Sequence, residues 1–368
     1  MAAWVKGGAT DAGTAIEAAA SLIAKARAPV IAGMSADVAA IRAAYDLAGR
    51  IGASVDTAGS AGTYAELGSL SRVGALTTTP AEAVGRADVV LVVGAAAWQA
   101  PLLKRLIDAK PTRGRAAGSD RALLAVGANA TATLAWPAGN GLPEAVGVLR
   151  ACARGHLAGD GLPGQIAARL AAAQYGVLLY DPAELGAYGV EMLQGLAMEL
   201  SETTRCFTLA VGGTGQDRAV VPVSAWLTGQ APRSGFGRRV PEHDPWRFDA
   251  ARQVAAGEAD AVLWLASVPV ARPDWLSNVP SVALVADGDA QAAEVVIAVG
   301  QPGRDHGGVL WNEQRAALTF WPASAPSELP PAASVLGALK ERLLAGQNSG
   351  QNSGQNSGQA ASRSVSAC

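Results

Sequence analysis

The residues that most often bind metals or act as nucleophiles are few in this chain. It has three cysteines and three histidines, at Cys152, Cys206, Cys368, His156, His243 and His306. No two of these six lie within three residues of each other, so neither a Cys-x-x-Cys nor a His-x-x-x-His motif is present. A cubane iron–sulfur cluster needs about four thiolates. We therefore expect no catalytic centre, no metal and no bound cofactor, although a metal site built from carboxylates and distant histidines stays open.

One glycine cluster, Gly212-Gly213-Thr214-Gly215, follows a predicted strand and has the bare backbone amides that bind phosphates. It fits neither the dinucleotide fingerprint nor the P-loop, which ends in Lys-Ser/Thr. Because the chain has 43 glycines, we interpret this cluster as a chance occurrence. The sequence also lacks a Gly-x-Ser-x-Gly elbow, and a catalytic triad assembled from distant residues is the alternative left open.

The segment from Trp226 to Phe248 combines arginines with glycines and aromatic residues. Arginines in such an irregular loop suit an anionic ligand or a carboxylate, which they bind in a bidentate manner. Trp and Arg are also enriched at subunit interfaces. Because no carboxylate or nucleophile accompanies the arginines, we favour an interface over a small-ligand site. The candidate contact residues are Arg233, Arg238, Arg239, His243 and Trp246.

Charge and hydropathy exclude several classes of partner. The formal net charge is −2, the pI is about 6.0, and the basic residues are scattered. A nucleic-acid or anionic-membrane surface would need them concentrated. Apolar runs are short, and the N-terminus lacks a basic stretch followed by an apolar core. We expect a cytoplasmic protein with no nucleic-acid and no membrane partner.

Helical and strand-like segments alternate along the chain, whose 368 residues suggest roughly two domains. After a flexible start, the first β-α-β unit has strands at Pro29–Ala32 and Ser54–Thr57. Its helices are predicted at Thr14–Arg27 and Ala36–Ile51. Further strands are predicted at Asp88–Val93, Ala122–Val126, Gly176–Tyr180, Cys206–Val211, Ala261–Ala266, Ser281–Val285 and Glu294–Ala298. Helices between them are predicted at Pro101–Asp108, Pro143–Arg154, Tyr188–Leu200 and Trp246–Gly257. Continuous apolar strands are typical of sheets covered on both faces, so we expect doubly wound α/β domains.

The C-terminal part is a predicted helix over residues 331–345 followed by a repeat. Three copies of Gly-Gln-Asn-Ser begin at Gly346. Small polar repeats cannot bury apolar surface, so residues 346–368 are predicted to be disordered. Upstream, Gly303 to Val309 places glycines beside charged residues, which is typical of a tight turn.

Several of these stretches together resemble the molybdopterin-binding oxidoreductases, and specifically the B subunit of formylmethanofuran dehydrogenase. The resemblance rests on the turn at Gly303–Val309 with Asn312–Arg315, and on the strand and helix at Tyr175–Leu200. It rests also on two segments in which an acidic residue precedes a strand, Ala87–Gly94 and Gly257–Trp264. The arginine-rich segment Trp226–Phe248 is a further point of resemblance. It covers roughly Thr14 to Pro322.

The resemblance implies a fold and a domain plan. It implies an α/β protein with two doubly wound Rossmann-like domains, the second inserted in the first. The first domain would comprise residues 1–68 and 165–330, and the inserted domain residues 69–164. In the family, a Cys or selenocysteine binds molybdenum or tungsten, and a cysteine-rich N-terminal domain holds an iron–sulfur cluster. This sequence begins past such a domain, and the metal-ligand position falls on Ala61, whose methyl group cannot bind a metal.

Because the sequence lacks the iron–sulfur domain and the metal ligand, it resembles most the B subunit of the formyltransferase/hydrolase complex of methylotrophic bacteria. A noncatalytic structural subunit is then implied, in tetrahydromethanopterin-linked oxidation of formaldehyde to formate. Its partners would be the hydrolase (A), C and formyltransferase (D) subunits. These partners would hold zinc and act on a methanofuran-like carrier and tetrahydromethanopterin. The alternative is an independent nucleotide-binding α/β enzyme that uses Gly212–Gly215 and the first β-α-β unit.

Overall fold

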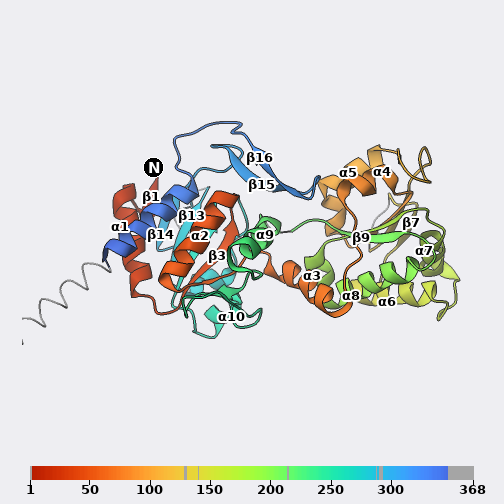
Figure 1. The fold of residues 1–368 in the computed structure, drawn as a ribbon, viewed down its shortest axis with the longest axis horizontal. Coiled ribbons are helices and arrows are strands. Elements are labelled where there is room, and N and C mark those ends of the chain that lie inside the picture. The colour runs from red at the N-terminus through yellow and green to blue at the C-terminus, as the bar shows by residue number, and fades with distance from the viewer. Residues whose placement is uncertain are drawn as a thin grey trace, which may run out of the picture. The chain divides into compact units, whose positions relative to one another are not determined.

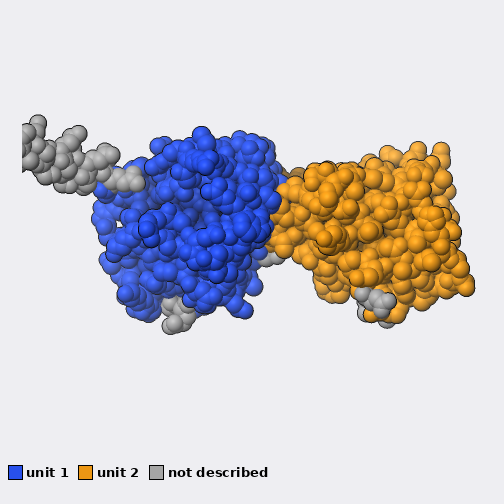
Figure 2. All heavy atoms as spheres, turned by 90° about the horizontal axis from the view of Figure 1, so that it is seen from below, with its two compact units in different colours: residues 1–58, 215–310, 320–368 blue, residues 59–214, 311–319 orange. Residues whose placement is uncertain are grey.

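The computed structural model describes residues 2–127, 131–139, 141–213, 215–286, 288–289 and 293–346. Contacts divide the chain into two compact units (Figure 2). Each unit has an α/β fold; the sheet of unit 2 is parallel, and that of unit 1 has parallel central strands. Unit 1 consists of Met1–Ala58, Gly215–Leu310 and Phe320–Cys368. Unit 2 consists of Gly59–Thr214 and Trp311–Thr319.

Unit 1 is built on a sheet whose described strands run in the order β11-β10-β4-β3-β12-β13-β14-β1-β2. The central five are parallel, and their register pairs Val30 with Ser54 and Val262. They are β4 (Ser54–Val55), β3 (Pro29–Ser35), β12 (Ala261–Ala266), β13 (Ser281–Val285) and β14 (Val295–Ala298). The outer strands are antiparallel: β11 (Glu242–His243) and β10 (Ser234–Gly235) at one edge, β1 (Ala3–Val5) and β2 (Gly8–Thr10) at the other.

Helices cover both faces of this sheet (Figure 1). On one face lie α1 (Ala12–Lys25), α2 (Val38–Ile51), α9 (Asp217–Thr228) and the helix of residues 332–346. Ion pairs from Lys340 to Asp46 and from Arg342 to Glu17 join the last helix to α2 and α1. The other face packs Trp264 and its neighbours against α10 (Ala250–Ala255) and η2 (Asp274–Asn278).

Unit 2 has a parallel sheet in the order β7-β6-β5-β8-β9. These strands are Leu134–Trp136, Ala122–Val126, Val89–Val93, Gly176–Tyr180 and Cys206–Ala210. One face packs against α3 (Ser60–Val73), α6 (Leu142–Ala153), α7 (Gly161–Ala171) and α8 (Pro182–Leu200). The other packs against α4 (Pro80–Arg86), η1 (Ala96–Gln99) and α5 (Pro101–Asp108). β15 (Gly308–Asn312) and β16 (Ala317–Trp321) form a separate two-stranded sheet.

An acidic residue before the central strand of each sheet fixes the start of a neighbouring strand. In unit 2, the Asp88 carboxylate accepts the amides of Gln174 (2.9 Å) and Tyr175 (2.8 Å), just before β8. In unit 1, the Asp260 carboxylate accepts the amides of Arg27 (2.8 Å) and Ala28 (2.9 Å), just before β3. The two acidic segments noted in the sequence thus satisfy amides that lie outside the strand ladder.

Most predicted elements of the two sheets are confirmed. The strands at residues 122–126, 176–180, 261–266 and 281–285 and the helix at 101–108 have the predicted bounds. The flexible start is wrong, because β1 and β2 extend the unit 1 sheet there. No helix was predicted around Ala61, where residues 60–73 form α3, which packs along α8.

The unit boundaries differ from the expected domain boundaries of 1–68 with 165–330 and 69–164. Residues 165–213 lie in unit 2, because β8 pairs with β5 and β9 pairs with β8. The C-terminal helix expected at 331–345 spans residues 332–346. The repeat predicted to be disordered lies, from residue 347 on, outside the described residues. Among the helices that the structure describes, none has the length and hydropathy to cross a bilayer.

Arg121 joins the ends of two helices in unit 2. Its guanidinium donates to the carbonyls of Val84 and Ala87 at 2.7 Å each, at the end of α4. It also donates to the carbonyls of Leu106 and, at 2.5 Å, Ala109, at the end of α5. Partial burial lowers the Arg121 pKa. Carbonyls at helix ends have no partner within the helix, so one planar cation satisfies several of them together.

We predict that Arg121→Lys lowers the free energy of unfolding by about 2–3 kcal/mol, because a single ammonium cannot reach both helix ends. Urea unfolding followed by circular dichroism measures the change. The exposed Arg169 on α7 provides the control, since Arg169→Lys changes the same groups without these bonds. Equal midpoints for the two variants would show that Arg121 is not a structural clamp.

Candidate functional site

The arginine-rich segment forms the connection between α9 and α10 in unit 1. Its β10 pairs with β4, where Ser234 is opposite Val55, and the amide of Phe236 donates to Ala53 O at 3.0 Å. A Cβ on Gly235 would lie 2.2 Å from the Phe248 ring, so only glycine permits this packing. The loop is therefore held to the sheet edge at several points.

Arg233 is a structural residue of this loop. Its Nη2 lies 2.5 Å from Asp249 Oδ2, its Nε lies 3.4 Å from Asp56 Oδ1, and its Nη1 donates to Pro245 O at 2.6 Å. The side chains of Arg233 and Asp56 are only 12% and 4% exposed. Our expectation that Arg233 is a carrier or interface contact is therefore not supported by its surroundings, which are the chain's own carboxylates.

Asp56 holds the loop to the end of β4 and the start of α10. Its Oδ2 accepts the amide of Ala250 at 3.0 Å, and its Oδ1 accepts that of Thr57 at 2.8 Å. Burial raises the pKa of Asp56 to about 6, although Arg233 and these amides favour the ionised form. Asp249 raises the pKa further through repulsion.

Arg238 and Arg239 differ from Arg233 in their exposure. The Arg238 side chain is 75% exposed, and its Nη1 donates to Glu242 Oε1 at 3.0 Å. Arg239 is also exposed, and its Nη1 donates to the carbonyl of Arg50 at the end of α2 at 2.7 Å. Arg239 lines a cavity of about 420 Å³ together with Arg50 and Arg342. Glu17 also lines this cavity and pairs with Arg342. No local motif in the sequence joins Arg50 or Arg342 to Arg239, because they lie on distant helices.

His243 and Trp246 complete the predicted set. His243 lies in β11, and its Nδ1 is 3.2 Å from Arg233 O. Trp246 is 70% exposed, and the Arg252 guanidinium carbon lies 4.2 Å from the centre of its ring. Trp226, at the end of α9, is 66% exposed. The loop thus presents large apolar rings and two accessible arginines on a rigid base, which suits binding to another macromolecule.

The glycine cluster is a poor receptor for phosphate. The amide of Gly212 donates to Glu313 Oε2 at 3.2 Å. A Cβ on Gly212 would lie 2.1 Å from Asp181 Oδ2. Two carboxylates in these positions repel an anion, which argues against the nucleotide-binding alternative. Thr214 lies outside the described residues.

Four of the cysteines and histidines, Cys152, Cys206, His243 and His306, are used in packing or in contacts with the backbone, whereas His156 is exposed. Cys206 is buried, and burial raises its thiol pKa to about 12, which keeps it neutral and unreactive. Cys152 Sγ lies 3.9 Å from Ala158 O, and His306 Nε2 lies 3.2 Å from Gly300 O. The described part of the chain contains no group of three His, Cys, Asp or Glu residues placed to hold a metal ion. Cys368 lies outside the described residues.

Comparison with known proteins gives one curated relative over nearly the full length. The B subunit of the formyltransferase/hydrolase complex Fhc from Methylorubrum extorquens is 53% identical over 356 residues, covering 94% of this chain and 98% of the relative. The chain belongs to the family of Fhc B subunits. No family model matches the sequence.

The fold agrees with a solved structure from the same organism. A chain in the crystal structure of the formyltransferase/hydrolase complex FhcABCD in complex with methylofuran aligns with a TM-score of 0.89. It is 52% identical, and the alignment covers 94% of this chain and 99% of that chain. An expectation of an α/β fold with parallel sheets is thereby confirmed for this member of the Fhc family.

Ala61 and the Gly303 turn complete the residues singled out in the sequence. In this member of the Fhc family, Ala61 is the second residue of α3 and is exposed. The turn is confirmed: the amide of Gly303 donates to His306 O at 2.8 Å, and Asp305 Oδ2 accepts the amide of Gln301 at 2.8 Å. The Asp305 carboxylate therefore stabilises the start of the turn.

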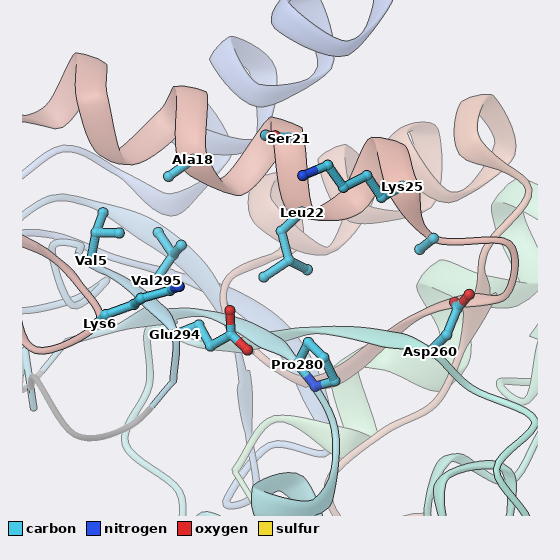
Figure 3. A pocket seen from close by; sticks show the side chains of 11 residues that line it. Val5, Lys6, Ala18, Ser21, Leu22, Lys25, Asp260, Pro280, Glu294 and Val295 are labelled. Atoms are coloured by element: carbon cyan, nitrogen blue, oxygen red, sulfur yellow. The ribbon is translucent and has the colours of Figure 1, made fainter.

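Another cavity of about 420 Å³ lies between α1 and the amino ends of β12, β13 and β14 in unit 1 (Figure 3). It contains Lys6, Lys25, Asp260 and Glu294, whose formal charges cancel. Asp260 is already bound to two backbone amides. Ligands of open α/β sheets bind at the carboxyl ends of the strands, so this location is unfavourable for an active site.

The raised pKa of Asp56 makes the free energy of unfolding decrease as the pH rises. Its folded pKa of about 6 lies above the ordinary 3.8, so the unfolded chain ionises first as the pH rises. Relative to Asp56→Asn, the wild-type free energy of unfolding should fall by about 2 kcal/mol between pH 4 and pH 7. Urea midpoints of both proteins across this range test the prediction. Parallel curves would show that Asp56 does not titrate in this window.

Proposed function

We propose that this chain is a noncatalytic structural subunit of a formyltransferase/hydrolase complex in one-carbon metabolism. The observation that carries this proposal is the 53% identity to the B subunit of the M. extorquens complex, which extends over 94% of one chain and 98% of the other. Such agreement along both chains supports the same role in the same assembly. We place the complex in the cytoplasm, in the tetrahydromethanopterin-linked oxidation of formaldehyde to formate.

The proposed partners are the A, C and D subunits, as the relative's complex is FhcABCD. We assign hydrolysis to the A subunit and formyl transfer to the D subunit, together with zinc and tetrahydromethanopterin. This chain would bind no cofactor of its own. Support comes from the neutral, buried thiol of Cys206 and from the carboxylates that surround Gly212, which suit neither a nucleophile nor a phosphate site.

The accessible part of the arginine-rich loop is the proposed contact region. The relative's complex was solved with methylofuran, and we propose that a methanofuran-like carrier passes along this assembly. Arg238, Arg239, His243 and Trp246 would contact a partner subunit or the carrier. Arg233 would position them, because its own charge is neutralised by Asp56 and Asp249.

We further propose that the fold is the doubly wound, Rossmann-like arrangement of formylmethanofuran dehydrogenase B subunits and the molybdopterin oxidoreductases. The strand order of unit 2, which extends from β5 in both directions, supports this proposal. The equivalent contacts of Asp88 and Asp260 also support it, since each carboxylate accepts amides from the segment before a neighbouring strand. In that scheme, Ala61 marks the position of a lost metal ligand.

The assembly is tested by affinity purification of the tagged chain from its native host. We expect hydrolase and formyltransferase subunits to co-purify with it, and the complex to release formate from formyl-tetrahydromethanopterin. A chain that purifies alone with a bound nucleotide would contradict the proposal and support the independent enzyme.

The role of the loop is tested by the triple change Arg238→Glu, Arg239→Glu and Trp246→Ala. We expect the yield of assembled complex or its carrier turnover to fall by roughly tenfold, equivalent to about 1.4 kcal/mol. Arg169→Glu, an exposed reversal in unit 2, is the control. Arg233 stays unchanged, so that the fold of the loop is preserved. Normal assembly and turnover in the triple variant would exclude these residues as contacts.

A further inference from the structure

Trp246, in the loop between α9 and α10, is 70% exposed and is nevertheless held on one face of its ring. The guanidinium of Arg252, on α10, lies over that face, with its carbon 4.2 Å from the ring centre. A guanidinium in this position attracts the electron-rich face of an indole ring. Because Arg252 covers one face, the exposed surface of Trp246 includes the opposite face of the ring.

Arg252 is itself fixed by hydrogen bonds. Its Nε donates to the carbonyl of Trp246 and its Nη2 to the carbonyl of Arg247, at 2.8 Å each. Its Nη1 and Nη2 donate to the two carboxylate oxygens of Glu258 at 2.8 and 2.5 Å, so the two charges compensate each other. The Arg252 side chain is only 18% exposed. The planar fork of an arginine can make such bonds and stack on a ring at the same time, which an ammonium cannot.

The backbone on either side of the ring is fixed as well. Asp244 Oδ1 accepts the amides of Trp246 at 2.9 Å and of Arg247 at 2.8 Å. The amide of Phe248 donates to Asp244 O at 3.1 Å, and the Phe248 side chain is buried. Trp246 is therefore ordered before any partner binds. An exposed aromatic side chain that is already ordered loses little conformational entropy on binding, which is the property of an interface anchor.

The shape around Trp246 favours a protein partner. Trp246 lines neither of the two cavities described above. Sites for small molecules are concave and bury most of the surface of the ligand. An exposed ring fits instead into a pocket on another protein, as anchors of protein interfaces do. The ring therefore suits a partner subunit better than it suits the carrier.

The charges beside Trp246 indicate the chemistry of that partner. Arg238 and Arg247 both approach Glu242, with nitrogen–oxygen distances of 3.0 and 3.7 Å, so two cations share one carboxylate. These arginine side chains are 75% and 56% exposed, whereas Glu242 is 27% exposed. A partner therefore meets guanidiniums at this surface, and carboxylates around its pocket would complement them.

We propose that Trp246 anchors this chain to another subunit of the complex by entering an apolar pocket rimmed by carboxylates, and that Arg252 is its positioning residue. The assignment rests on the proposed function and deepens it, since it gives Trp246 to a protein partner and not to the carrier. Arg252 acts through Trp246, because its own nitrogens are bonded within the chain.

The first experiment measures dissociation of the purified complex on dilution, for wild type, Trp246→Ala and Trp226→Ala. Mass photometry of each complex gives the dissociation constant. Trp226 is the matched control, because it is 66% exposed and, within the described part of the chain, no cation or ring is stacked on it. Trp246→Ala should raise the dissociation constant by about tenfold, and Trp226→Ala by less than about twofold.

The second experiment is a double-mutant cycle with Arg252→Met, whose side chain can still cover the ring but forms none of the four hydrogen bonds. Alone, Arg252→Met should raise the dissociation constant by roughly threefold, because Trp246 is no longer held. Combined with Trp246→Ala, it should have no further effect. A merely structural role of Arg252 would weaken assembly equally in both backgrounds. If Arg252→Met does not fold, Arg252→Lys takes its place in the cycle.

The acidic rim is tested with Arg247→Glu. This variant should raise the dissociation constant by about fivefold at about 50 mM NaCl and by less than about twofold at about 500 mM, where salt screens exposed charges. A loss that is independent of salt would exclude carboxylates at the rim of the pocket.

The outcomes separate this contact from the proposed function. Wild type that assembles, together with Trp246→Ala that dissociates no more readily, would overturn the anchor and leave the proposed function intact. Normal assembly of Trp246→Ala with a loss of carrier turnover would assign the ring to the carrier instead. A wild-type chain that co-purifies with no partner would contradict the proposed function and this contact with it.

Discussion

Backbone amides that the strand ladders leave unpaired are satisfied by the chain's own carboxylates, and both units depend on this interaction. At the amino ends of the strands, Asp88 and Asp260 each accept two amides from the segment before a neighbouring strand. At the carboxyl ends, Glu184 and Asp56 accept amides from a turn or from a helix start. These carboxylates give the amides the partners that the ladders do not supply, and they hold the starts and ends of the parallel strands next to their neighbours.

The same constraint explains how unit 1 can carry a rigid arginine-rich loop. Ionised Asp56 is unfavourable in its buried position, as its raised pKa shows. Arg233 compensates for that charge and is compensated in turn by Asp249, so the three groups are stable together. Removing one of the three groups leaves the charge of another buried without a partner. The free energy lost in this way exceeds the net free energy that the ion pair contributes to stability. The exposed members of the loop, Arg238 and Trp246, can therefore vary in their contacts while the base of the loop stays fixed.

The elements that local residue patterns determine could be predicted from the sequence. Continuous apolar runs bounded by Gly, Asp or Pro, such as Gly176–Tyr180, defined the buried strands correctly. The helix α3 was not predicted, and its Gly62 and Gly68 lower the helix propensity of this segment. That helix is stabilised by packing, with Gly62 lying close to Ala183 of α8. The candidate loop was found from its composition, but its division into structural Arg233 and exposed Arg238 depends on Asp56 and Asp249, which lie on other elements.

Glycine-rich turns at the carboxyl ends of strands are usually treated as signs of a bound ligand, and here their surroundings decide otherwise. A glycine provides a close backbone approach for any acceptor, whether that acceptor is a phosphate or a side chain. At Gly94 the acceptor is Glu184, and at Gly212 the neighbours are Asp181 and Glu313. A chain that fills such turns with its own carboxylates keeps the stability that a ligand would supply, without needing the ligand. An α/β scaffold can in this way remain folded while its chemistry resides in other subunits.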